Sequence, residues 1–156
     1  MSVNDIIDEQ DVMKAHEHQF ILWPRQWSGY VDTHNWKTYN LNENQKVNIP
    51  DNPGIYSLLI QPGIANHPAC SYLMYIGKTT SLRRRFSNYL NERKRETGRP
   101  KIFRILNKYK NYMKFCYTIV DEDDLETVEN NLLIAFIPPN NDQFPVQLRP
   151  LIGAFR

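Results

Sequence analysis

The sequence predicts one α+β domain in which a small sheet is backed by helices. Its 156 residues suit a single compact domain, because a chain of this length can bury a sizeable core but is too short for two ordinary domains. Hydrophobic residues at 41% and charged residues at 23% are typical of a globular protein. From residue 54 onward, the apolar patterns follow in the order strand, strand, helix, helix, strand, helix. This order is expected to fold as a sheet with helices packed against it.

Three segments are expected to form the strands. Gly54–Ile60, "GIYSLLI", is rich in Ile, Tyr and Leu and follows the turn "IPDNPG". Ser71–Gly77, "SYLMYIG", is interpreted as the returning strand of a hairpin, beyond the long loop "QPGIANHPAC". Met113–Asp121, "MKFCYTIVD", is the third predicted strand.

Three helices are expected to pack on these strands. Ser81 is predicted to cap a helix that runs to about Arg93, and Pro100 to open a second that runs to about Tyr109. Leu125–Phe136 is predicted as the third helix and is followed closely by two prolines, which cannot continue it.

Residues 1–50 carry the least regular pattern. A short helix is expected to begin at Asn4 or Asp5, and the segment after it is aromatic and interrupted by proline. The three tryptophans of the chain lie there, at positions 23, 27 and 36. Large aromatic side chains of this kind are more often buried in a core, which favours packing over base stacking or partner binding by this segment.

Membrane, secretory and redox functions find no support in the sequence. No apolar run approaches the roughly 18 residues of a spanning helix, and the start "MSVNDIIDEQDV" lacks the pattern of a signal peptide, so we expect a cytoplasmic protein that uses no membrane. Cys70 and Cys116 have no CxxC partner and no metal-ligand spacing, which favours two reduced thiols over a redox or zinc site.

The charges are distributed unevenly along the chain. The segment from Lys78 to Lys114 holds 13 of the 19 Lys and Arg and only two of the 17 acids. A basic middle in an otherwise acidic chain predicts a surface that attracts a polyanion, with the DNA backbone as the leading candidate. The alternative is that these charges only solvate two helices. The candidate nucleic-acid-binding residues are Lys78, Arg83, Arg85, Arg93, Lys94, Arg95, Arg99 and Lys101.

Glu129 occupies a costly position on the last predicted helix. On a helical wheel it falls near the middle of the apolar face, with Leu125 and Leu133 one turn away on either side. A carboxylate there needs a partner or a metal. A buried salt bridge or a position under a loop would satisfy it, but Mg²⁺ or Mn²⁺ would also suit a single carboxylate, because Mg²⁺ prefers oxygen ligands and keeps several waters.

On the same kind of helical wheel, the arginines of "SLRRRF" point to different sides of the helix. Arg85 borders the apolar face and can reach towards the hairpin, where its planar guanidinium suits a phosphate oxygen. Arg84 projects away from that face and is expected to be surface charge. Tyr56 and Tyr75 lie on the two hairpin strands, and Gly77 ends the second strand, where the backbone can approach another group closely.

These residues together resemble the GIY-YIG nuclease family. "GIY" at Gly54–Tyr56 and "YIG" at Tyr75–Gly77, followed by Arg85 and later by a helix carrying Glu129, match the pattern of that family. The resemblance covers about residues 53 to 142. Eighteen residues separate the two tripeptides, more than is usual in the family, and the excess lies in the long hairpin loop, which we expect to contact DNA or a partner.

The resemblance implies a role for each matching residue. Tyr56 would be the general base or the proton relay for the attacking water, Tyr75 would support it by hydrogen bonding, and Tyr89 matches another tyrosine near the site. Arg85 would hold the scissile phosphate and Glu129 would bind the single divalent metal. The remaining implied site residues are Lys78, as an active-site or phosphate contact, and Asn141, which orders the site and competes with Asn140 for that role.

The resemblance also implies the fold and the reaction. It implies a three-stranded antiparallel sheet flanked by helices. Residues 51–145 would form the nuclease domain and residues 146–156 a tail. Residues 1–50 would be an N-terminal extension that packs on the core or contacts DNA or a partner. The reaction would be metal-dependent DNA cleavage to 5′-phosphate and 3′-hydroxyl ends, and the extension without a separate targeting module leans towards a restriction-like enzyme. A non-catalytic nucleic-acid-binding module and a repair or structure-selective nuclease subunit that needs a partner remain alternatives, as does a homodimer.

Overall fold

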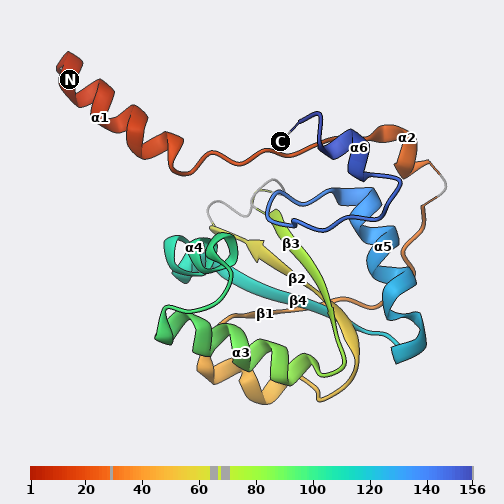
Figure 1. The fold of residues 1–156 in the computed structure, drawn as a ribbon. Helices are drawn as coiled ribbons and strands as arrows, with labels where there is room; N and C mark the ends of the chain where they lie inside the picture. Colours follow the sequence, from red (N-terminus) through yellow and green to blue (C-terminus); the bar gives the residue numbers. More distant parts are fainter. Residues whose placement is uncertain (29, 64–66, 68–70, 156) are drawn as a thin grey trace.

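An antiparallel sheet forms the centre of the molecule (Figure 1). The computed structural model describes residues 1–28, 30–63, 67 and 71–155. Its sheet has the strand order β1-β4-β2-β3. The strands are β1 (Lys37–Asn40), β2 (Gly54–Ile60), β3 (Tyr72–Thr79) and β4 (Met113–Ile119). The three predicted strands are therefore confirmed within about two residues at each end.

The prediction of three strands is nevertheless wrong, because β1 adds a fourth at the edge. Its residues pair with β4, Lys37 opposite Tyr117 and Asn40 opposite Lys114. The sequence "KTYN" is short and mostly exposed, and only Tyr39 is half-buried, so it carries no alternating apolar signal. Backbone pairing with a distant strand, and the stacking of Tyr39 on Tyr117, form this strand.

The β2–β3 hairpin contains an irregularity beside the YIG tripeptide. Leu58 pairs with Tyr75, but the next residue, Leu59, pairs with Leu73, so Met74 is an extra residue in β3. Met74 and Tyr75 consequently pack on the same face of the sheet, although neighbouring residues of a regular strand face opposite sides. A bulge of this kind re-aims a side chain, and here it directs Tyr75 to the face that carries Tyr56.

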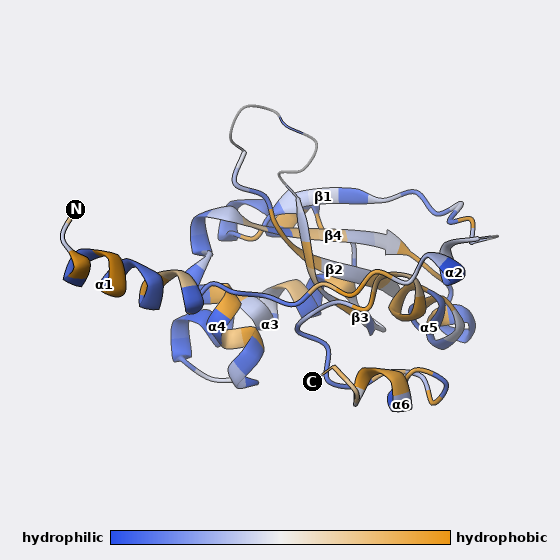
Figure 2. Cartoon of the chain, turned by 90° about the horizontal axis from the view of Figure 1, so that it is seen from above, coloured by the Kyte–Doolittle hydropathy of each residue, from blue (hydrophilic) through white to orange (hydrophobic). Residues whose placement is uncertain are grey.

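Helices cover both faces of the sheet. α3 (Leu82–Arg95) and α4 (Pro100–Lys108) pack on the face that contains Tyr56 and Phe115, and α5 (Leu125–Phe136) packs on the other. Ser81 caps α3 as predicted, because its hydroxyl accepts a hydrogen bond from the Arg84 N–H. All three predicted helices are confirmed. Figure 2 shows the hydrophobic residues gathered where the helices meet the sheet.

Shorter elements complete the chain. The predicted N-terminal helix is α1 (Val3–Lys14), with Ser2 and Asp5 forming a capping box. It buries no residue and extends away from the sheet (Figures 1 and 2). The remaining elements are α2 (Pro24–Trp27), η1 (Glu43–Asn48), η2 (Lys110–Tyr112), η3 (Glu122–Asp124) and α6 (Arg149–Ile152).

The tryptophans and cysteines of the chain differ in how far they are buried or described. Trp23 and Trp36 pack partly buried against the α5 side of the core, whereas Trp27 is 45% exposed. Cys116 is a free thiol, while Cys70 and most of the hairpin loop lie outside the described residues. No helix within the described ranges is long and apolar enough to cross a membrane.

Candidate active site

The predicted site residues meet along β3. Pairing places Gly77 opposite Tyr56 and Lys78 opposite Ile55. Because side chains alternate along a strand, Gly77 faces α3 and α4, whereas Lys78 faces α5. β3 is an edge strand of the described sheet, so side chains from both faces can converge around its outer side.

Tyr56 and Tyr89 form a buried hydroxyl pair. Their Oη atoms are 2.8 Å apart, and the two residues are 2% and 1% exposed. Burial is the main cause that raises the pKa of both phenols above the ordinary value, and the nearby Arg85 guanidinium opposes this without reversing it. Both tyrosines are therefore neutral near pH 7, where each hydroxyl can donate and accept a hydrogen bond.

The glycines of the two tripeptides are needed for close packing. A Cβ on Gly77 would lie 2.5 Å from Tyr56 Cζ, well inside van der Waals contact. A Cβ on Gly54 would lie 2.7 Å from Leu82 Cδ1 and would also meet the Thr118 carbonyl oxygen. The glycine of YIG thus makes room for the tyrosine of GIY on the adjacent strand, which explains why the two tripeptides occur together.

Arg85 lies between the tyrosines and the solvent. Its Nε is buried and has no hydrogen-bond partner among the described residues, which is costly for a charged donor unless a ligand completes it. Arg85 lines a cavity of about 450 Å³ together with Lys78 and Arg84. Arg84 is exposed, as expected, and donates a hydrogen bond of 3.0 Å to Thr80 Oγ1, so it is surface charge that also borders this cavity.

Glu129 projects from α5 to the other side of the same strand edge. Its side chain is 17% exposed, and one carboxylate oxygen lies 3.5 Å from Lys78 Nζ. Burial raises the pKa of Glu129, and Lys78 opposes that rise. The predicted buried-side carboxylate is thus present together with a salt bridge, one of the two explanations that the sequence left open.

The surroundings of Glu129 fit a hydrated divalent cation. The carboxylate borders a cavity of about 210 Å³ that Tyr75, Arg99 and Asn141 also line. At roughly 30 Å³ of liquid volume per water, that space holds about seven waters, enough for an ion that keeps most of its hydration shell. Within the described part of the chain, no three His, Cys, Asp or Glu residues gather as a metal cluster, and the carboxylates that line this cavity are those of Glu129 and Asp142.

Asn141 ties the segment after α5 to the edge of β3. Its Oδ1 accepts a 3.0 Å hydrogen bond from the Ile76 N–H, and its Nδ2 donates a 2.8 Å hydrogen bond to the Ile76 carbonyl. The neighbouring Asn140 N–H donates to the Met74 carbonyl. Both asparagines therefore stabilise β3, but Asn141 is the one that lines the Glu129 cavity.

Arg99 joins this group although the sequence indicated only a general phosphate contact. Its guanidinium lies 4.9 Å from the centre of the Tyr75 ring and donates a 3.0 Å hydrogen bond to the Tyr75 hydroxyl. Gly98, at φ +101°, makes the preceding turn possible, and a Cβ there would lie 2.6 Å from Glu92 Oε2. "TGRP" signals a turn before a helix, but nothing local in it shows which side chain across the fold Arg99 meets.

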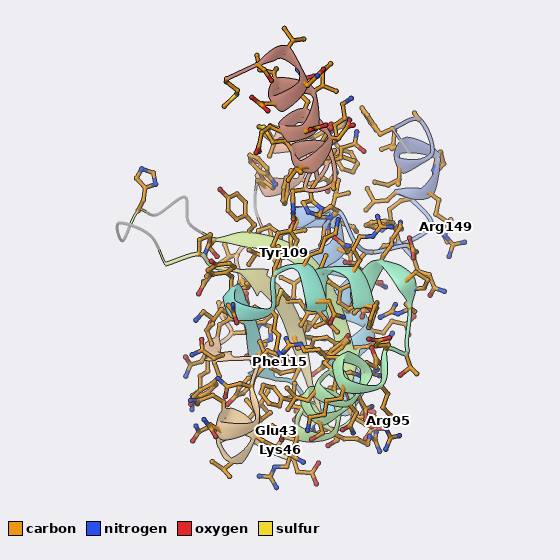
Figure 3. The ribbon with its side chains drawn as sticks, turned by 90° about the vertical axis from the view of Figure 1, so that its left-hand side faces the viewer. Glu43, Lys46, Arg95, Tyr109, Phe115 and Arg149 are labelled. Carbon is orange, nitrogen blue, oxygen red and sulfur yellow. The ribbon has the colours of Figure 1, made fainter. Side chains whose placement is uncertain are left out.

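Several other predicted DNA-contacting cations are engaged within the protein. Arg83 Nε donates a 2.8 Å hydrogen bond to the Ile49 carbonyl, and an Arg93 nitrogen donates to the Leu41 carbonyl at 3.1 Å. Lys94 pairs with Glu43 at 2.8 Å, while Arg95 lies exposed at the end of α3 (Figure 3 labels Glu43 and Arg95). Lys101 pairs with Asp142. The structure therefore divides the basic segment into cations that tie α3 to residues 41–49 and cations around the β3 edge.

Known structures similar to this chain contain a nuclease domain. No family model and no curated protein matches the sequence. The GIY-YIG N-terminal endonuclease domain of UvrC from Thermotoga maritima, bound to magnesium, has a TM-score of 0.45 and 24% identity over 63% of this chain and 92% of that domain. Two point mutants of the same domain with a bound catalytic divalent cation have TM-scores of 0.45 and 0.46 and identities of 22% and 23%, each over 64% of this chain and 93% of the domain. The name of these domains is that of the family whose two tripeptides this chain resembles.

Proposed function

We propose that this chain is a divalent-metal-dependent DNA endonuclease of the GIY-YIG type. One observation carries the proposal: Lys78 lies 3.5 Å from the half-buried carboxylate of Glu129 and shares a cavity with Arg85, whose buried Nε has no hydrogen-bond partner among the described residues. Glu129 is a ligand for a cation, and Arg85 is a ligand for an anion. A phosphodiester with its metal ion supplies both charges at once.

Arg85 and Lys78 would bind the scissile phosphate. Arg85 offers a planar guanidinium whose buried Nε has no partner in the part of the chain that the structure describes, and Lys78 lines the same cavity. As water attacks phosphorus and the bond to the 3′ oxygen breaks, negative charge increases on the phosphate oxygens, and preorganised cations stabilise that charge. The products would carry 5′-phosphate and 3′-hydroxyl ends.

Tyr56 would serve as a proton relay rather than as a phenolate base. Its raised pKa keeps the hydroxyl protonated, so it would take a proton from the attacking water only as its own proton leaves along the 2.8 Å hydrogen bond to Tyr89 and from there to solvent, which leaves both phenols neutral again. Tyr75, held by Arg99, would orient the water or phosphate through its hydroxyl.

Glu129 would hold Mg²⁺ or Mn²⁺ in the cavity that Tyr75 and Asn141 line. When bound, the ion would lower the pKa of a coordinated water and neutralise phosphate charge. Asn141 would keep the strand edge in place through its two hydrogen bonds to Ile76.

Cleavage assays with matched variants test this function. The full chain is expected to cut plasmid, single-stranded or branched DNA in Mg²⁺ or Mn²⁺ and to stop in EDTA. Glu129→Gln and Arg85→Ala should lower the rate by about 100-fold or more, whereas Glu9→Gln on α1 and Arg25→Ala on α2, both exposed, should cleave nearly as fast as the parent. If no substrate is cut, or if the site variants cut as fast as their controls, the chain is not this nuclease.

The cleavage ends would identify the biological class of nuclease. We infer a restriction-like enzyme if the ends fall at defined sequences. Cutting confined to branched junctions would instead indicate a repair or recombination nuclease, and salt-dependent DNA binding without cleavage in any divalent metal would indicate a binding module.

A further inference from the structure

A third cavity lies at the opposite end of β3 from Lys78. It has a volume of about 600 Å³, within the range of pockets that bind small organic groups. Its walls come from the segment after α1, the adjacent ends of β2 and β3, and the residues that follow α4. Figure 3, where Tyr109 is labelled, shows that end of α4 close to the chain leaving α1.

Aromatic rings form much of this cavity. Its ring-bearing lining residues are His16, His18, Phe20, Tyr72, Tyr109 and Tyr112. Phe20, Tyr72 and Tyr112 are each 46% exposed, so three large aromatic side chains have surface left uncovered at one place. Phe20 and Tyr72 are neighbours, with ring centres 6.2 Å apart. Exposed aromatic rings around a cavity provide surfaces on which a flat ring can stack.

The polar groups of the cavity form an arrangement that can read the edge of such a ring. His16 Nδ1 lies 2.9 Å and His18 Nε2 lies 2.8 Å from the Tyr109 hydroxyl. The hydroxyl has one proton, so when both imidazoles are neutral one ring accepts from it and the other donates to it. In the imidazole that accepts from Tyr109, the remaining ring nitrogen is then a donor. In the imidazole that donates to Tyr109, the remaining ring nitrogen is an acceptor. Neither of these two nitrogens has a hydrogen-bond partner among the described residues. A donor and an acceptor together match the edge of a nucleobase.

Charge and position connect this cavity with the candidate active site. Lys108 and Lys110 flank Tyr109 in the sequence and supply positive charge for a phosphate backbone. Met74, next to Tyr75 in β3, forms part of the wall. α4 lies between Arg99, which lines the Glu129 cavity, and Tyr109, which lines this one, and its nine residues span about 13 Å at 1.5 Å per residue.

We propose that this cavity binds an unstacked nucleobase of the DNA substrate, on the strand whose phosphate is held at Arg85. The inference rests on the proposed function, because the DNA strand reaches the cavity from that site. It makes the chain a reader of single-stranded or distorted DNA, since a base inside intact duplex is not free to enter a pocket. Stacking on aromatic side chains tolerates any base, so the cavity selects DNA structure more than sequence.

Fluorescence titrations in EDTA, where no cleavage occurs, test this proposal. The probe is a DNA hairpin with a single-stranded tail that carries 2-aminopurine at one tail position at a time, and a blunt hairpin serves as the reference. The full chain should bind the tailed probe more tightly and quench 2-aminopurine at one or two positions only. Tyr72→Leu should weaken binding of the tailed probe by about 5- to 150-fold, the range for loss of one stacked base, and leave the blunt hairpin unaffected.

Two matched variants control for effects on folding and for the loss of an exposed aromatic ring in general. Tyr72→Phe keeps the ring and should bind as the parent does, and Phe136→Leu removes an aromatic residue that is 49% exposed elsewhere on the surface and should also bind as the parent does. Equal affinity for tailed and blunt DNA, or a loss in Tyr72→Leu that is the same for both, would overturn the proposal.

The cleavage assay in Mg²⁺ is separate from this titration. If the protein cuts DNA in Mg²⁺ but binds tailed and blunt hairpins equally in EDTA, only the base pocket is refuted. If it binds the tailed hairpin more tightly but cuts no DNA, the base pocket is supported and the nuclease function is refuted.

Discussion

Replacing Gly77 by alanine tests how the two tripeptides work together. The new Cβ would lie 2.5 Å from Tyr56 Cζ, and ordinary contact begins near 3.4 Å, so the Tyr56 ring must move by about 1 Å. The ring cannot move freely, because it stacks on Phe115 at 5.2 Å and its hydroxyl is hydrogen-bonded to Tyr89. Overpacking of this kind destabilises a core by about 1–3 kcal/mol, which for a chain of this length lowers Tm by about 2 to 12 °C.

The same displacement should lower activity more than it lowers stability. A shift of about 1 Å in a group that acts on the substrate can reduce the rate by about 100-fold, and the loss should appear in kcat because the phosphate contacts of Arg85 and Lys78 remain. Cleavage kinetics and thermal unfolding measure the two effects. Gly153→Ala is the matched control, since its Cβ would meet nothing closer than 3.4 Å. If Gly77→Ala keeps the parent's Tm and kcat, close packing of Tyr56 on Gly77 is not what the glycine provides.

Three further predictions concern neighbouring residues. Asn141→Ala leaves the buried Ile76 N–H and C=O without their side-chain partner and should destabilise the protein by about 1–3 kcal/mol for each unpaired group, measured by urea unfolding; unchanged stability would contradict that anchoring. Folding raises the pKa of Glu129, so the stability of the parent falls as the pH rises from the unfolded-state pKa near 4.3 through the folded-state pKa. Glu129→Gln should therefore have a higher Tm than the parent at pH 7 and a similar Tm at pH 3. A lower Tm for Glu129→Gln at pH 7 would show that the carboxylate stabilises the folded state instead. Arg99→Ala should reduce cleavage by about 10- to 150-fold through the lost charged hydrogen bond to Tyr75, with little further loss in a Tyr75→Phe background; additive losses in this double-mutant cycle would show that Arg99 acts independently of Tyr75.

Local patterns were sufficient to predict most of the framework. The Ser81 cap, the proline at the start of α4 and the run of Ile, Tyr and Leu in β2 all depend on residues within a few positions of one another, and the structure contains each of the elements they predict. β1 was missed because its four residues have almost no apolar character, and its pairing depends on β4, more than seventy residues away.

The candidate site shows the same division. The wheel correctly predicted Glu129 on the inner side of α5 and Arg85 at the border of α3. Nothing in the sequence of the second hairpin strand indicated the bulge at Met74 that turns Tyr75 towards Tyr56. The turn predicted before α4 likewise did not show that Arg99 contacts Tyr75. Those positions depend on how two strands are aligned and on where a turn lies over the sheet.

The sequence by itself determined which chemical groups are present and which elements carry them: two tyrosine-bearing strands, an arginine on one helix and a glutamate on another. Only the tertiary structure decided their electrostatic state. Burial raises the pKa values of Tyr56, Tyr89 and Glu129, and it leaves Arg85 Nε without a partner among the described residues. The physical reason is that charge stabilisation depends on how much solvent and which partners surround a group, and here those partners come from segments that are distant in the chain.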